Sequence, residues 1–304
     1  MLKLMRCAVA LTVLSAGNVL AEPPTVTTDI LPVHSLVAAV MEGVAEPSVI
    51  ISSGATPHDY SMRPSDAGLL QDAEVVFWVG HDLTPWLGDS IGSLAPDARI
   101  VELLEHEGTA TLSFREGAQF GAHGHDDDHG HDHEGDDPHA WLDPANGQAW
   151  LRLIAEVLAE TDPENAIQYA ANADAAIAKI DAVVADAEAQ ISEVRGRNYV
   201  VFHDAFQYFE TRFDIEASGA ISIGDAETPS AARIAEITAL IDEKDIACVF
   251  AEPQFNSALV TTVFGEADAK AAIIDPLGST LQTGPTLYPN LIRDTAGSLA
   301  DCLR

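Results

Sequence analysis

The pattern of apolar and polar residues predicts alternating strands and helices in two blocks. In the first block the pattern predicts strands at 25–29, 48–51, 74–79 and 99–102, and helices at 32–41, 64–71 and 85–91. In the second block it predicts strands at 199–202, 215–218, 247–251 and 271–274, and helices at 205–212, 230–243, 256–269 and 287–303. Such alternation is typical of mostly parallel sheets covered by helices, so we predict an α/β protein with two lobes.

The longest helical pattern joins the two blocks, after a shorter helix expected at 145–160. Asp162-Pro163 has the form of a cap followed by a proline, apolar residues then recur every three or four positions, and Gly196 ends the segment. We predict one helix of about 33 residues, roughly 50 Å long. Such a helix is longer than a small lobe is wide, so we interpret it as a backbone that spans both lobes. An exposed coiled-coil arm is the alternative.

The first 21 residues have the pattern of a secretory signal peptide. Lys3 and Arg6 precede a mostly apolar run from Ala8 to Ala16, and the segment ends in Val19-Leu20-Ala21. The apolar run is too short to span a bilayer, so we expect cleavage after Ala21 and export. The predicted division of the chain is then 1–21 signal peptide, 22–160 first lobe, 161–197 linking helix and 198–304 second lobe.

The formal net charge of −33 excludes nucleic acid and anionic membrane surfaces as expected partners. Export would leave two cysteines, Cys248 and Cys302. In an oxidising compartment they favour one disulfide, which would close a loop of about 55 residues and contribute about 4 kcal/mol. Two buried thiols are the alternative.

Six of the eleven histidines lie between residues 123 and 139. Five of them stand in an acidic, glycine-rich tract, within a segment (105–138) that lacks periodicity: His123, His125, His129, His131 and His133. We expect a long loop, with a mobile His- and acid-rich part at 115–138. Imidazole and carboxylate groups bind metal ions, so this tract is a candidate accessory collector of metal. A solvated acidic loop that binds metal only incidentally is the alternative.

A separate set of metal-capable residues follows predicted strands or the long loop. Ligands in open α/β sheets gather beyond the carboxyl ends of strands, which is where we expect His58, His203 and Asp275, while His139 follows the loop. Three imidazoles and one carboxylate form a four-coordinate set that suits zinc.

Each of these residues also has a structural interpretation. His58 can be a surface residue, Asp204 can cap a helix beside an incidental His203, Asp275-Pro276 can be a turn, and His139 can cap the following helix. Glu252 also ends a predicted strand, and we interpret it as a hydrogen-bond partner of a ligand or as a structural carboxylate. We interpret the remaining histidines as non-ligands: His34, His81 and His106.

Five motifs resemble those of the metal-binding solute-binding proteins of bacterial ABC transporters, in particular the zinc-specific, ZnuA-like branch: GATPHDYSMRPSD, DPHAWLDP, VVFHDAFQYF, FAEPQF and IIDPLG. The resemblance implies two Rossmann-like lobes with mostly parallel sheets joined by one long rigid helix. It also implies the ligands His58, His139 and His203, with Asp275 or a water in the fourth position. Pro57 stands where some zinc members have Glu, which favours Asp275. The His-rich loop and the disulfide also resemble the zinc branch.

The implied function is that of a periplasmic protein that captures Zn²⁺ between its lobes and delivers it to an inner-membrane ABC permease. The resemblance implies a monomer without enzymatic activity, and a periplasmic zinc metallochaperone is a further candidate partner. The alternatives are manganese or iron as the cargo, a zinc buffer or adhesin without a permease, and a zinc hydrolase. The hydrolase would need an open coordination position beside a base such as Glu252. Three histidines argue against manganese, because imidazole is a softer ligand than manganese prefers.

Overall fold

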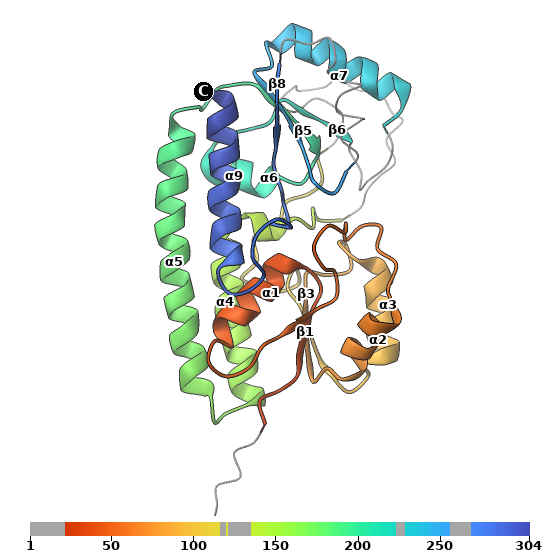
Figure 1. Cartoon of the computed structure of the whole chain (residues 1–304), viewed down its shortest axis with the longest axis vertical. Helices are drawn as coiled ribbons and strands as arrows, with labels where there is room; N and C mark the ends of the chain where they lie inside the picture. The colour runs from red at the N-terminus through yellow and green to blue at the C-terminus, as the bar shows by residue number, and fades with distance from the viewer. Residues whose placement is uncertain (1–21, 116–119, 121–134, 223–228, 256–268) are drawn as a thin grey trace, which may run out of the picture.

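The computed structural model describes residues 22–115, 120, 135–222, 229–255 and 269–304. These residues form two four-stranded sheets, one in each half of the molecule (Figure 1). The first sheet has the order β2-β1-β3-β4, with the bounds Ser48–Val49, Val26–Thr28, Val75–Trp78 and Arg99–Glu102. The second has the order β6-β5-β7-β8, with the bounds Gly219–Ser222, Tyr199–His203, Cys248–Ala251 and Lys270–Ile273.

Every strand pair in these two sheets is parallel. All residues of β3 and β5 are buried, as expected where helices cover both faces of a parallel sheet. The predicted α/β class is therefore confirmed. The two sheets also share one strand order, so β1 corresponds to β5 and β3 corresponds to β7, although the sequence shows no repeat between the halves.

The helices in the described residues cover these sheets and connect their strands. Their bounds are Leu31–Val40 (α1), Pro64–Gln71 (α2), Pro85–Leu94 (α3), Ala140–Leu142 (the 3₁₀ helix η1), Pro144–Thr161 (α4), Ala166–Ser192 (α5), Gln207–Phe213 (α6), Ala231–Lys244 (α7) and Leu287–Leu303 (α9). Proline occupies the first or second position of α1, α2, α3 and α4, where its missing N–H has no helical partner to lose.

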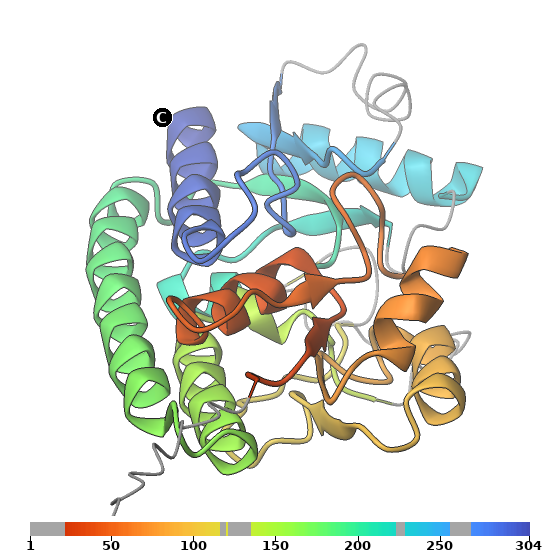
Figure 2. The ribbon, with the colours of Figure 1, turned by 60° about the horizontal axis from the view of Figure 1, so that its bottom comes forward.

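The long helix α5 is present but has 27 residues, so the predicted start and length were wrong. Asp162 ends α4, and its carboxylate accepts hydrogen bonds from Asn165 Nδ2 and the Tyr169 hydroxyl. These bonds hold residues 162–165 in a turn, so α5 begins at Ala166. The helix packs against α4 and α9 and runs along both halves of the molecule (Figures 1 and 2).

The strand predicted at 215–218 was placed too early, because β6 begins at Gly219. Asp214 ends α6 in the left-handed region with φ of 52°, and the Ile215 carbonyl accepts a hydrogen bond from the buried Tyr199 hydroxyl. These contacts keep the segment before Ser218 out of the sheet. The helix predicted at 256–269 lies, up to residue 268, outside the described residues.

One hydrophobic core runs through both lobes, and a smaller cluster lies between β5, β6 and α7. The last helix, α9, contacts α1 of the first lobe as well as α5 and β8. The predicted disulfide is confirmed: Cys248 of β7 is bonded to Cys302 of α9, with the Cα atoms 6.0 Å apart. The lobes are therefore packed together rather than joined only through a linker.

Candidate metal centre

His203 ends β5 and is held by a carboxylate from the neighbouring strand. Its Nδ1 lies 2.6 Å from Glu252 Oε1, which also accepts a hydrogen bond from the His203 backbone N–H at 3.2 Å. Glu252 directly follows β7, and parallel strands end at the same edge of a sheet, so the pairing follows from the sheet order. Nδ1 then carries the proton, and Nε2 presents its lone pair to the pocket.

His139 is held in the same way by a residue close to it in sequence. Asp137 Oδ1 accepts hydrogen bonds from the His139 backbone N–H at 3.0 Å and from Nδ1 at 2.7 Å. The Tyr208 hydroxyl donates to the Asp137 carbonyl at 2.6 Å, and burial raises the pKa of Tyr208, so it stays a donor. Although His139 precedes the long helix, its segment is thus fixed against the second lobe.

His58 lies on the loop between β2 and α2 and is half-buried. The carbonyl of Pro57, directly before it, accepts a hydrogen bond from Trp86 Nε1 of α3 at 3.0 Å. Tyr60, two residues after His58, packs its ring 5.5 Å from that of Trp86. The loop that presents His58 is therefore anchored on α3.

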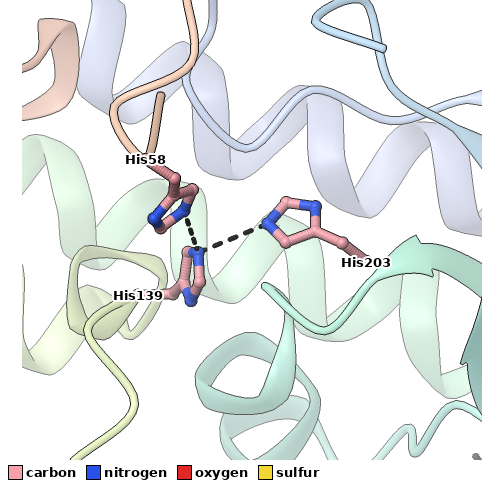
Figure 3. Close-up of side chains that lie close together, drawn as sticks. All are labelled: His58, His139 and His203. Carbon is pink, nitrogen blue, oxygen red and sulfur yellow. Dashed lines mark hydrogen bonds between the residues drawn. The ribbon is translucent and has the colours of Figure 1, made fainter. Parts of the chain in front are cut away.

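The three imidazoles converge from these separate elements on one point (Figure 3). His139 Nε2 lies 3.3 Å from the Nε2 atoms of both His58 and His203. Two nitrogens bound to a tetrahedral zinc ion, each about 2.0 to 2.1 Å from it, lie about 3.3 to 3.4 Å apart. Both of these distances fit a tetrahedral ion, and the ligand atoms of all three histidines lie within 4.8 Å of one another. This is the one such group of potential ligands found among the described residues.

Asp275, the fourth predicted ligand, lies beside this group without joining it. Its Oδ1 accepts hydrogen bonds from Gln254 Nε2 and the Leu277 N–H, and its Oδ2 accepts from the N–H and hydroxyl of Ser279. The next two residues, Pro276 and Leu277, line the pocket that contains the histidines. The carboxylate therefore holds the adjoining turn at the edge of the site.

Asp204, the residue after His203, also has a defined partner in the structure. Asp204 does not cap α6, because the N-cap residue of that helix is Phe206. Asp204 pairs instead with the partly buried guanidinium of Arg115. Burial would lower the pKa of Arg115, but Glu210 and Asp204 outweigh that effect and raise it.

The histidines interpreted as non-ligands lie outside the group formed by His58, His139 and His203: His34, His81 and His106. The five histidines of the acidic tract lie outside the described residues: His123, His125, His129, His131 and His133.

Sequence reasoning missed Asp137 and Trp86. An acidic residue two positions before a ligand is a usable signal for Asp137, because its side chain can reach back to both the N–H and the ring of His139. Trp86 carried no such signal, since 28 positions separate it from His58 and only the packing of α3 brings it near.

A family model described as "Zinc-uptake complex component A periplasmic" matches residues 26–302. The chain belongs to this family. Among its relatives is the high-affinity zinc uptake system protein ZnuA of Brucella abortus (strain 2308), 41% identical over 94% of each chain. The protein of the same name from Paracoccus denitrificans (strain Pd 1222) is 40% identical over 93% of each chain.

The fold agrees with that assignment. A solved structure titled "Crystal structure of ZnuA" matches with a TM-score of 0.78 and 21% identity, over 93% of this chain and all of that one. None of the helices in the described part of the chain has the length and apolar character needed to cross a membrane.

Proposed function

We propose that this chain is a periplasmic zinc-binding protein that captures Zn²⁺ between its lobes and delivers it to an ABC transporter permease for import. One observation carries the proposal: three imidazoles from both sides of the molecule meet, and His139 Nε2 lies 3.3 Å from the Nε2 atoms of the other two, a spacing suited to tetrahedral zinc. Family membership and the names of the relatives support zinc as the cargo.

The proposed ligands are His58, His139 and His203. Asp275 remains our candidate for the fourth position, where it would exchange hydrogen bonds from Ser279 for a bond to the ion. A site closed by four protein groups favours retention of the ion over catalysis, so we propose that the protein has no enzymatic activity.

Several finer features extend this proposal. The signal peptide at 1–21 would be removed on export, and the protein would act as a monomer, with a zinc metallochaperone as a possible donor. The division into 22–160, 161–197 and 198–304 would describe two lobes and a rigid link. The five tract histidines would collect Zn²⁺ weakly for the tight site.

The test is a competitive zinc titration of the mature protein from which residues 121–134 have been deleted. We expect one tight stoichiometric site in this deletion protein, and loss of that site when His139 or His203 is replaced by Ala. Absence of a tight site in the intact mature protein, or unchanged affinity in either Ala variant, contradicts the proposal. Growth on limiting zinc by cells that lack the chromosomal copy tests delivery to the permease.

A further inference from the structure

The two carboxylates that hold the histidines differ in how fully they are bonded. Asp137 Oδ1 accepts two hydrogen bonds from His139, and its Oδ2 receives the amide nitrogen of Gln207 at 3.0 Å once that amide is turned to suit its neighbours. Glu252 accepts two hydrogen bonds from His203, and both of them reach Oε1. Its Oε2 is buried and has no hydrogen-bond partner among the described residues.

The Glu252 side chain is fully buried, with an exposed fraction of 0%. A buried carboxylate oxygen without a donor is costly, because no water replaces the lost hydration. No lysine or arginine lines the surrounding pocket in the described part of the chain, and the only ion-pair partner found for Glu252 there is the ring of His203. The described residues thus provide little positive charge to balance the Glu252 carboxylate.

We propose that Glu252 is a positioning residue whose negative charge balances the divalent cation through His203. This inference rests on the proposed function and concerns the same site. The carboxylate fixes the proton of His203 on Nδ1, turns Nε2 toward the ion, and raises the basicity of that nitrogen. The fully bonded Asp137 orients His139 similarly, but its donors already offset more of its charge.

Glu252→Gln tests the charge separately from the hydrogen bond, because the amide oxygen can still accept from His203 Nδ1. We expect the dissociation constant for Zn²⁺ to rise about 10- to 100-fold. We also expect the melting temperature of the metal-free protein to stay level or to rise, because an uncompensated buried charge has been removed. A merely structural residue would instead lower that melting temperature.

Asp137→Asn is the matched control. It should weaken Zn²⁺ binding less than Glu252→Gln does, and it should lower the metal-free melting temperature, because the amide cannot accept from donors on both sides. Glu252→Leu removes the bond to Nδ1 as well. It should weaken binding further and change the visible absorption of the Co²⁺-loaded protein, which reports ligand geometry.

Two results would overturn the inference alone: wild-type protein that binds tightly while Glu252→Gln binds within threefold of it, or Glu252→Gln that lowers the metal-free melting temperature as Asp137→Asn does. Wild-type protein without a stoichiometric Zn²⁺ site would instead overturn the proposed function, and this inference with it.

Discussion

The two sheets have the same strand order, yet the carboxyl ends of their central strands serve different purposes. At the end of β1, Asp29 accepts hydrogen bonds from the N–H groups of Ile30 and Val79, both at 2.7 Å, and is fully buried. At the end of β5, His203 pairs with Glu252 and lines the pocket that contains the three histidines. The carboxylate after β1 is held by backbone N–H groups, whereas His203 at the end of β5 presents its Nε2 atom to the pocket.

This difference shows that a position at the end of a strand can hold a functional side chain. The position alone does not make that side chain functional. In the first lobe the proposed ligand comes instead from the loop after β2, which carries His58. The carboxylate of Asp29 accepts a backbone hydrogen bond on each oxygen, so it stabilises the junction of β1 and β3. The two strand ends should therefore respond to mutation in different ways.

His203→Ala and Asp29→Ala should separate affinity from stability. A structural zinc site is worth about 10 to 16 kcal/mol over four ligands, so losing His203 should weaken Zn²⁺ binding by several hundred-fold. Losing Asp29 leaves two buried N–H groups unpaired and should cost roughly 2 to 4 kcal/mol of stability, with little effect on affinity. Urea unfolding and zinc titration measure the two quantities. A large affinity loss in Asp29→Ala would remove the contrast.

The contribution of Asp29 to the stability of the metal-free protein should fall as pH rises from about 4 to about 7. Burial raises the pKa of Asp29 to about 7, against the opposing effect of the hydrogen bonds from Val79 and Ile30. The folded state therefore keeps a proton that the unfolded chain releases near pH 4. This contribution is complete below about pH 4 and is lost up to about pH 7, by roughly 3 to 4 kcal/mol. The matched variant Asp29→Asn should lack this component when unfolding is measured from pH 4.5 to 8. Parallel curves for the two proteins would contradict the assignment.

Asp275→Asn examines the fourth position of the site. If Asp275 moves onto the ion, the variant should weaken Zn²⁺ binding about 10- to 100-fold, because a neutral amide oxygen is a poorer ligand than a carboxylate. Ser279→Ala is the control, since it removes one hydrogen bond to Asp275 and leaves the carboxylate in place. Unchanged affinity in Asp275→Asn would assign the fourth position to water.

Trp86→Phe should have the smallest effect, on the first-lobe side of the site. The variant removes the hydrogen bond from Nε1 to the Pro57 carbonyl and keeps most of the ring contact with Tyr60. A neutral hydrogen bond contributes about 0.5 to 1.5 kcal/mol, so affinity for Zn²⁺ should fall by about 2- to 10-fold. Stopped-flow release of Zn²⁺ to a chelator should show faster dissociation. A loss as large as that of His203→Ala would mean that the His58 loop depends on Trp86 for its fold.

The sequence by itself determined the alternation of strands and helices, the existence of the long helix and the residues of the disulfide. These features follow from local periodicity and from residue type, which is why β4, α2 and α9 have the predicted bounds. The histidines could be nominated for the same reason, since their position after apolar runs is visible along the chain. Local patterns predicted the bounds of an element less accurately where a tertiary hydrogen bond holds the chain in another conformation. This happens at Asp162 before α5 and at Ile215, which bonds to Tyr199.

Only the tertiary structure decided how the nominated residues meet. The 3.3 Å spacing of the Nε2 atoms, the pairing of His203 with Glu252 and the support of Pro57 by Trp86 join residues that are 29 to 81 positions apart. The hydrogen bonds that hold Asp275 in its turn, and the similar strand order of the two sheets, were equally hidden. Distances of this kind depend on how whole elements pack, and no periodicity along the chain encodes them.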